Sequence, residues 1–311
     1  MVDRVLSVST GGTYGAWEAG VLKALVERSE REGKDRPWQA MYGASAGAFN
    51  VAFISMFASQ GTGVRALADY WVDHADESQG VRMGLFDACV RYCGNKSSLL
   101  DLAVLEPLLR GLDFNRVGAF TPTWVAVTNV KAQRGELKRL ENPSNLSGAR
   151  LVDVREGNRT LLLASMSVPG LFEEVTYKNV TYLDPLLTIP VPNPQNAEKV
   201  AWLDVVVAPK SPLQPGKDLI SVMQNSLEIL MNTATNASIA AIANHYHKKA
   251  HLWTKPLRTV VPSFLTLDKN LARALVNEGY KLAANPNNEQ LGAPQIDYSA
   301  LIVAPTGARI M

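Results

Sequence analysis

The sequence is poor in cysteine, and this shortage excludes a disulfide-stabilised fold. Only Cys89 and Cys93 occur among 311 residues, which is too few for a disulfide framework. Because they are spaced four apart on an expected helix, they share one face, and we expect buried or free thiols rather than a metal site. Low cysteine content is typical of a reducing compartment, so we expect a cytoplasmic protein.

The sequence also lacks a secretory signal and a long apolar run. The N-terminus, MVDRVLSVSTGG, carries Asp3 and no extended apolar core. The longest apolar stretch, at 44–58, is interrupted by Asn50 and is shorter than the roughly 20 residues of a membrane span. We therefore expect a soluble protein that contacts membranes only peripherally, during catalysis.

An excess of charge of either sign is missing as well. The formal net charge is +2, and no run of Lys and Arg exceeds two residues, which argues against a nucleic-acid partner. Apolar residues make up 47% and charged residues 19% of the chain, enough for a large core. Since neither an internal repeat nor a low-complexity linker is present, we predict one domain spanning residues 1–311.

Short apolar runs alternate with helical patterns along the chain. Strands are expected at 4–9, 38–42, 123–130, 135–141, 180–183, 203–208, 260–267 and 300–304. Helices are expected at 16–30, 48–58, 62–75, 98–112, 158–166, 218–251 and 268–284. The alternation predicts an α/β fold with a mainly parallel sheet covered on both faces. Segment 78–96 is expected to be an insertion or lid, and 285–295 a polar loop.

A serine flanked by small residues follows the second expected strand. Residues 43–47 are GASAG and precede an apolar helix. A serine on such a sharp turn is held in a strained backbone conformation with its hydroxyl exposed above the sheet, and its neighbours must be small. The following helix N-terminus favours a developing negative charge. The pattern predicts Ser45 as a nucleophile, with Gly43 and Gly47 forming its elbow.

A glycine loop, TGGTYG at 10–15, follows the first expected strand. Consecutive glycines let backbone N–H groups turn toward an anion. A nucleotide-phosphate site is disfavoured, because Thr10 stands where the G-x-G-x-x-G pattern requires glycine and no Gly-Lys-Ser/Thr follows. Loops after two adjacent parallel strands meet at the carboxyl edge of a sheet, where α/β ligand sites form. We expect this loop to supply oxyanion donors near Ser45.

The third candidate is Asp184, directly after the short strand expected at 180–183. A serine hydroxyl needs a base to become nucleophilic. A carboxylate that is hydrogen-bonded directly to the hydroxyl can serve, provided that its surroundings shield it from bulk water. These requirements make Asp184 the candidate base for Ser45.

Together the three motifs resemble the patatin-like phospholipase family. The stretch VSTGGTYGAWEAGVLKAL within 6–25 is similar to the family's oxyanion loop and first helix, and GASAGAFN at 43–50 is similar to its nucleophile elbow. ASMSVPGLF at 164–172, followed by Asp184, is similar to the approach to its catalytic aspartate. The resemblance covers most of residues 4–283.

The resemblance implies a three-layer α/β/α sandwich and a lipid acyl hydrolase with a Ser–Asp dyad that uses no histidine, metal or cofactor. It implies that Ser45 attacks an ester carbonyl while Asp184 accepts the serine proton. It also implies that amides around Gly11, Gly12 and Thr13 hold the oxyanion. Phospholipids or other acyl esters are the implied substrates, with the headgroup, the acyl position and the oligomeric state left open.

Three positions depart from the family pattern. Thr10 and Tyr14 stand where the family usually has a third glycine and a basic residue, but backbone donors depend on neither side chain. Pro185 stands where glycine usually follows the aspartate. Since proline fixes φ near −65°, a requirement for positive φ at this position would displace Asp184.

Two other functions stay open. A Ser-His-Asp esterase or thioesterase would need a late histidine, for which His245, His247 and His251 are available, although we expect them on a helix rather than in a loop. His247 and His251 are spaced for metal binding, but no H-E-x-x-H pattern accompanies them. The non-catalytic alternative is a lipid-binding module with a decayed site.

For the acyl chain of a lipid substrate, we expect a channel formed by the apolar segments 53–57 and 85–86.

Overall fold

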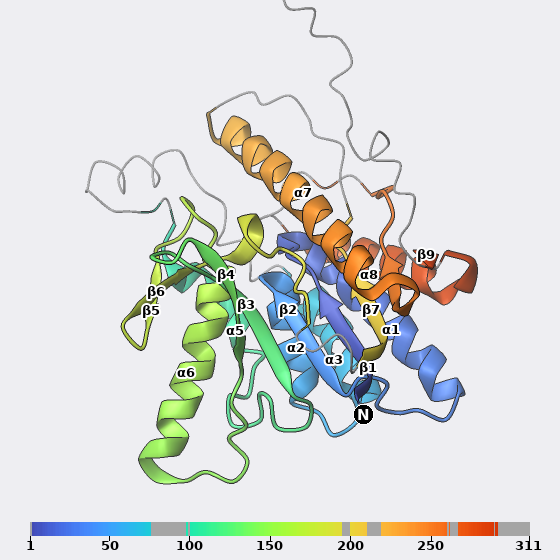
Figure 1. Ribbon diagram of the computed structural model, residues 1–311, viewed down its shortest axis with the longest axis horizontal. Helices are drawn as coiled ribbons and strands as arrows, with labels where there is room; N and C mark the ends of the chain where they lie inside the picture. The colour runs from blue at the N-terminus through green and yellow to red at the C-terminus, as the bar shows by residue number, and fades with distance from the viewer. Residues whose placement is uncertain are drawn as a thin grey trace, which may run out of the picture.

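A computed structural model describes residues 2–75, 98, 100–194, 200–209, 219–259, 261, 267–288 and 290–291 of the chain. A central β-sheet is covered by helices on both faces (Figure 1). The structure therefore confirms the predicted α/β fold with a mainly parallel sheet. Among the helices of these described ranges, none combines the length and the apolar character needed to cross a membrane.

The sheet has a parallel centre and antiparallel edges. The five central strands lie in the order β3-β2-β1-β7-β8 and are all parallel. Their bounds are β1 Val2–Val8, β2 Ala40–Ala44, β3 Thr123–Asn129, β7 Val200–Val206 and β8 Ala250–Trp253. The antiparallel strands are β4 Arg134–Arg139, β5 Val175–Tyr177, β6 Val180–Leu183 and β9 Gln290–Leu291. The loop that leaves β1 is therefore central in the fold.

Side chains of β1 alternate between two hydrophobic cores, as the period of two of a strand requires. Leu6 and Val8 point into the larger core, which is shared with helices on one face, whereas Val5 points into a smaller core under a single long helix. The helices of the larger core are α1 Gly15–Arg31, α2 Ala46–Ser55, α3 Gln60–Asp73, α6 Gly148–Met166 and α8 Lys269–Ala284. The long helix is α7, Leu219–Tyr246. The result is the predicted three-layer arrangement.

Helices α1 and α8 touch through their backbones. A Cβ added at Gly20 would lie 2.0 Å from the carbonyl oxygen of Val276, and one added at Gly279 would lie 2.1 Å from the carbonyl oxygen of Trp17. No side chain fits in either gap, because real Cβ contacts are essentially never shorter than 3.0 Å. The two glycines thus let the last long helix pack directly on the helix that follows the glycine loop.

A buried carboxylate in the sheet, that of Asp204, links β7 to β1, to β8 and to the segment before β2. Asp204 of β7 is fully buried and accepts hydrogen bonds from Arg4 Nε at 2.7 Å, Trp38 Nε1 at 2.8 Å and Trp202 Nε1 at 3.0 Å. Arg4 and Trp38 donate to Oδ2, whereas Trp202 donates to Oδ1, and Trp253 Nε1 also donates to Oδ1 at 3.4 Å. Burial alone would raise the pKa of Asp204, but the Arg4 charge and these hydrogen bonds hold it below the usual range.

Several predicted elements differ in extent from those in the structure. The helix expected at 98–112 is a 3₁₀ turn, Leu102–Leu105, followed by the single-turn helix α5, Glu106–Leu109, with Asp101 capping the turn. The helix expected at 158–166 begins at Gly148 in the structure. Its first turns were not predicted because they are polar and largely exposed and show no apolar period. Segment 78–96, the strand expected at 300–304 and both cysteines lie outside the described residues, as does most of 260–267.

The helix expected at 218–251 ends early, and its last residues form a strand instead. Helix α7 stops at Tyr246, and His247, with φ of 48°, turns the chain into β8. Ala250 to Trp253 are all buried and pair with β7, so a long-range contact overrides the local helical pattern. The hairpin partner β5 was likewise not predicted, and β9 lies within the expected polar loop.

Candidate active site

Ser45 has the strained backbone of a nucleophile elbow. Its φ and ψ are 53° and −122°, and it occupies the N-cap position of α2. A serine at this position normally uses its hydroxyl to cap the helix, but here no side-chain cap bond is made. The carbonyl of Ser45 instead accepts the N–H groups of Ala48 at 2.9 Å and Phe49 at 3.1 Å. The hydroxyl is therefore left available for chemistry.

The small residues of the elbow are required by close backbone contacts. A Cβ added at Gly43 would lie 2.3 Å from the carbonyl oxygen of Gly47. One added at Gly47 would lie 2.4 Å from the carbonyl oxygen of Ser9 and 2.7 Å from that of Val8. The first turn of α2 thus packs against the carboxyl end of β1, which brings Ser45 beside the glycine loop.

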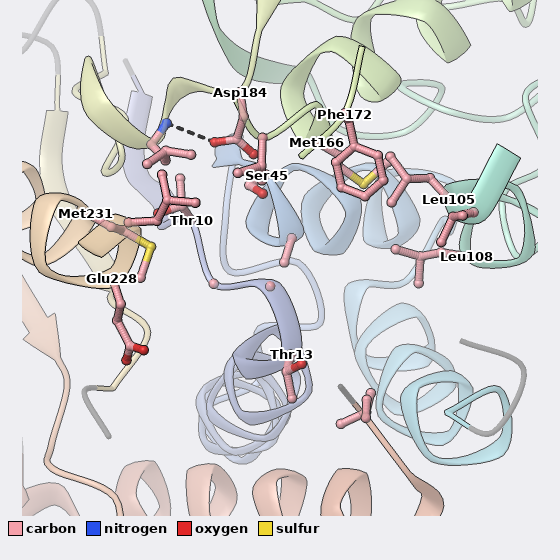
Figure 2. A pocket seen from close by; sticks show the side chains of 18 of the residues that line it. Thr10, Thr13, Ser45, Leu105, Leu108, Met166, Phe172, Asp184, Glu228 and Met231 are labelled. Carbon is pink, nitrogen blue, oxygen red and sulfur yellow. Dashed lines mark hydrogen bonds between the residues drawn. The ribbon is translucent and has the colours of Figure 1, made fainter. Parts of the chain in front are cut away.

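Asp184 is fixed at the end of β6 by hydrogen bonds of its own backbone. Its N–H donates to the carbonyl of Ser167 at 2.9 Å, and its carbonyl accepts the Thr128 hydroxyl at 3.0 Å. Its carboxylate Oδ1 accepts the N–H of Leu186 at 2.8 Å, which caps the 3₁₀ helix Pro185–Leu187. Pro185 is the first residue of this helix, a position that tolerates proline. Asp184 therefore keeps its place beside Ser45 (Figure 2).

The carboxyl group of Asp184 has a raised pKa and is a weaker acid than an ordinary aspartate. Complete burial raises its pKa from 3.8 to about 7, while the nearby Ser45 hydroxyl and the Leu186 amide act in the opposite direction. Its second oxygen, Oδ2, has no aligned hydrogen-bond partner among the described residues. The Ser45 hydroxyl is thus close enough to influence the pKa without completing a well-directed hydrogen bond, a common state before substrate binds.

The end of α6 connects the two candidate residues. Ser165 Oγ accepts the backbone N–H of Ser45 at 3.0 Å, and the carbonyl of Ser167 accepts the N–H of Asp184. Both serines are fully buried. In the sequence this segment carries only the resemblance described above, and no local pattern indicates the role of Ser165, because that role depends on a contact with a residue 120 positions earlier.

The glycine loop presents backbone donors beside Ser45. Residues 12–14 form a 3₁₀ turn, and Gly12 has a φ of 51°, which favours glycine. The N–H of Thr10 donates to the carbonyl of Pro190 at 2.7 Å, whereas the N–H groups of Gly11 and Gly12 donate to no other residue in the described ranges. These two glycines and Thr13 line the same pocket as Ser45 and Asp184.

A buried acid lies under the glycine loop and ties it to the helices. Glu18 of α1 accepts hydrogen bonds from Ser9 Oγ and Asn50 Nδ2, both at 3.0 Å. Asn50 also donates to the carbonyl of Gly15 and accepts the indole N–H of Trp71. Burial raises the pKa of Glu18 well above its usual value, against the lowering effect of Ser9 and Asn50. This network joins the loop to α2 and α3.

A largely apolar pocket opens above the two candidate residues. It holds about 990 Å³ of empty space, including its open mouth. Its polar lining comes from the glycine loop, Ser45, Asp184 and Glu228 (Figure 2). Its apolar lining is supplied by Val104, Leu105, Leu108, Met166, Val168, Phe172, Leu186, Leu227, Met231 and Leu267, with Trp71 and Ala46. Such a cavity suits a hydrocarbon chain near a polar reacting group.

The prediction that residues 53–57 form part of an acyl-chain channel is wrong. The Phe53 ring packs against the rings of Phe49, Phe57 and Tyr70 inside the larger core, and residues 53–57 do not line the pocket. Leu105, Leu108 and Phe172 supply the apolar wall instead. Residues 85–86 lie outside the described part of the chain.

None of the three late histidines lines the pocket. His245 is exposed near the end of α7, and His247 is in the turn that follows. His251 is buried on β8, where its ring stacks on Trp202 with centroids 3.4 Å apart and planes at 8°. Among the residues that the structure describes, no group of three or more His, Cys, Asp or Glu side chains is arranged to hold a metal ion.

The model of the patatin-like phospholipase family matches residues 6–192, more than half of the chain. The chain therefore belongs to the patatin-like phospholipase family, and this membership supports a lipid hydrolase function. The matched range contains the glycine loop, Ser45 and Asp184. No curated protein matches the sequence.

Two solved structures are similar to the chain at low sequence identity. VipD from Legionella pneumophila is 12% identical with a TM-score of 0.42, and the similarity covers 93% of this chain and 67% of that one. A chain of the heterodimeric ExoU–SpcU complex from the type III secretion system of Pseudomonas aeruginosa is 15% identical with a TM-score of 0.34. There the similarity covers 93% of this chain but only 52% of that chain, about half its length.

Proposed function

We propose that the chain is a serine acyl hydrolase that cleaves lipid esters through a Ser45–Asp184 dyad. One observation carries the proposal: a serine hydroxyl released from helix capping lies beside a buried carboxyl group whose pKa is about 7. Both groups line an apolar pocket next to the backbone N–H groups of Gly11 and Gly12, which donate to no other described residue. The family membership makes a lipid ester the natural substrate.

In the first half of the proposed reaction, Asp184 accepts the proton of the Ser45 hydroxyl. The serine oxygen forms a bond to the ester carbonyl carbon, and the carbonyl electron pair moves onto its oxygen. Amides of Gly11, Gly12 and Thr13 stabilise this oxyanion. When the oxyanion collapses, the bond to the leaving oxygen breaks, and that oxygen takes the proton from Asp184. The products are a free alcohol and acyl-Ser45.

In the second half, Asp184 accepts a proton from water while the water oxygen bonds to the acyl carbon. The bond to the serine oxygen then breaks, and Ser45 recovers its proton from Asp184. The net change is one ester and one water converted into one acid and one alcohol. A carboxylate can act as the base here because its raised pKa lets it accept a proton near neutral pH.

We also propose that the protein meets its lipid substrate at a membrane surface, through one face of α7. Val222, Ile229 and Leu230 recur at helical spacing on this helix and are 49%, 53% and 51% exposed. Leu187, the last residue of the 3₁₀ helix that Asp184 caps, is 44% exposed, and that helix contacts α7. We call Leu187, Val222, Ile229 and Leu230 the α7 face. It borders the pocket wall made by Leu227 and Met231, and clustered exposed apolar residues of this kind mark interaction sites.

Labelling with a fluorophosphonate probe tests the dyad. The probe should form an adduct on Ser45, located by mass spectrometry, at a rate that falls at least about 100-fold in Asp184→Asn. Ser144→Ala, which changes an exposed loop serine, should label like the unaltered protein. An adduct on another residue, or undiminished labelling of Asp184→Asn, would refute the proposal.

The cytoplasmic location expected from the low cysteine content stays a prediction.

A further inference from the structure

The described lining of the pocket around Ser45 carries acidic side chains and no cationic ones. Among its described lining residues, Asp184 and Glu228 carry ionisable carboxyl groups, and none is Lys, Arg or His. Asp184 serves the proposed dyad, whereas Glu228 has no part in that chemistry. Because α7 contributes otherwise apolar or uncharged side chains to the wall, a charged residue at this position needs a separate explanation.

Glu228 lies across Ser45 from the apolar wall. Figure 2 shows Leu105, Leu108 and Phe172 on one side of Ser45, and Met231 and Glu228 of α7 on the other. An ester whose carbonyl is at Ser45 and whose acyl chain lies along the apolar wall extends its leaving group in the opposite direction. The leaving group of such a substrate would therefore extend toward the side of the pocket that carries Glu228.

The carboxyl group of Glu228 is half-buried and paired with Tyr14, the last residue of the 3₁₀ turn in the glycine loop. Burial raises its pKa to about 7, and the hydrogen bond with Tyr14 acts against this rise. A tyrosine hydroxyl orients a carboxylate but does not neutralise its charge. A cation brought by the ligand would stabilise the ionised form, as opposite charges at short range do.

We propose that Glu228 selects ester substrates whose leaving group carries a cationic nitrogen, such as the choline or ethanolamine group of a phospholipid. This inference rests on the proposed function, since it assigns the leaving-group side of the same site. An ammonium group would pair with the Glu228 carboxylate. A headgroup with net negative charge would instead meet Glu228 and Asp184, and no cation among the described lining residues offsets the repulsion.

The test compares two lipids that differ only in the headgroup. Phosphatidylcholine and phosphatidylglycerol with identical acyl chains are presented in neutral detergent micelles, and kcat/KM is measured for each. The unaltered protein should prefer phosphatidylcholine, and Glu228→Gln should lower the preference ratio about tenfold, as expected for loss of a charged pair. Glu228→Lys should invert the ratio. Because both lipids react at the same serine, a general loss of turnover cancels in the ratio.

Asp153→Asn is the matched control, since it removes the same charge from an exposed position of α6 outside the pocket. It should keep both turnover and the preference ratio of the unaltered protein. An unchanged ratio in Glu228→Gln, or an initial preference for phosphatidylglycerol, would overturn the inference. A ratio that also fell in Asp153→Asn would assign the preference to overall charge at the micelle surface, and would equally overturn it.

A binding measurement separates this inference from the proposed function. Calorimetric titration of Ser45→Ala with dodecylphosphocholine and with dodecyl phosphate, both below their micelle concentrations, reports headgroup preference without turnover. Preference for phosphocholine that disappears in Ser45→Ala/Glu228→Gln supports the inference even if no ester is cleaved, in which case the hydrolase proposal fails alone. Cleavage of a simple aryl ester by the unaltered protein without any headgroup preference overturns the inference and leaves the hydrolase proposal standing.

Discussion

Gly47 packs so closely on Ser9 that a Cβ on the glycine would lie 2.4 Å from the serine carbonyl oxygen. Ser9 directly follows β1 and precedes the glycine loop, while Gly47 belongs to the turn that carries Ser45. This contact therefore sets the distance between the candidate nucleophile and the candidate oxyanion donors.

Gly47→Ala should separate the elbow from β1. The added methyl group cannot be accommodated without moving α2, so we expect a loss of stability of about 2–3 kcal/mol and a loss of most probe labelling at Ser45. Urea unfolding and labelling rates measure the two effects. Gly63→Ala on α3 is the milder comparison, because its Cβ would lie 3.2 Å from Phe57 and 3.3 Å from Ile54, which requires shifts of only a few tenths of an ångström, and it should lose less stability and keep its labelling. Full labelling in Gly47→Ala would show that the contact does not position Ser45.

Asp184→Asn should abolish turnover and yet stabilise the fold at neutral pH. In the unfolded chain the carboxyl ionises near 3.8, whereas in the native state it stays protonated up to about 7. As pH rises between these values, ionisation increasingly favours the unfolded state, and the penalty is complete above 7. At 1.36 kcal/mol per pKa unit, removing this ionisation penalty should raise the free energy of unfolding by about 1–4 kcal/mol.

The gain from Asp184→Asn should appear at pH 8 and shrink toward pH 4 in urea unfolding. Asp153→Asn, at an exposed position, should show no comparable gain. An Asp184→Asn difference that is equal at both pH values would mean that Asp184 is not held protonated in the native state.

Hydrolysis of a small neutral ester should depend on pH through the same group. The base must be ionised to accept the serine proton, so kcat/KM should fall about tenfold per pH unit below about 7 and level off above it. Glu228, which also has a pKa of about 7, is the other group expected to titrate in this range. The acidic limb should persist in Glu228→Gln. Its disappearance there would assign the limb to Glu228 instead.

Arg4→Met should destabilise the fold far more than Asp204→Asn. Removing Arg4 leaves a fully buried carboxylate with only neutral indole donors, a change that typically costs about 3–5 kcal/mol. Because Arg4 lowers the pKa of Asp204, this stabilisation is present above the usual aspartate pKa and is lost as the pH falls through the lower native value.

Thermal or urea unfolding of the two single variants and the double variant measures the coupling between Arg4 and Asp204. Neither residue lines the pocket, so the turnover of folded protein should be unchanged. Equal stability of Arg4→Met and the unaltered protein at pH 7 would contradict the prediction.

Ile229→Asp and Leu230→Asp should weaken binding to lipid vesicles. Each places a charge on the α7 face, and we expect the affinity for neutral phosphatidylcholine vesicles to fall about tenfold, measured by sedimentation. Asn244→Asp adds the same charge at an exposed position near the other end of α7 and should bind as the unaltered protein does. Equal losses in all three variants would point to net charge rather than to this face.

The features of the fold that depend on local geometry could be predicted from the sequence. The two glycine-containing turns could be recognised because each requires small residues at fixed positions, and the alternation of elements predicted the parallel sheet. Strand β8 could not be predicted, because Ala250 to Trp253 become a strand only through pairing with Leu203 to Val206, which are distant in the chain. Strand β5 likewise depends on its pairing with β6.

The site was accessible from the sequence only in part. Ser45, Asp184 and the glycine loop belong to recognisable motifs, and the structure brings them into one pocket. The contact of Ser165 with Ser45 and that of Glu228 with Tyr14 join segments more than 100 residues apart. No local sequence pattern predicts such contacts. The roles of the dyad and the single domain over residues 1–311 stay predictions.

The pocket is assembled from two stretches of chain with different tasks. Every residue of the proposed reaction lies within 6–192, the range matched by the family, while Leu227, Glu228, Met231 and Leu267 come from beyond it. Substitutions in one turn of α7 can therefore redirect substrate choice while the reacting groups keep their positions. The same division means that a chain cut at residue 192 would lack β7 and leave β1 unpaired along one edge. The oxyanion loop would then follow an exposed edge strand, which is prone to aggregation.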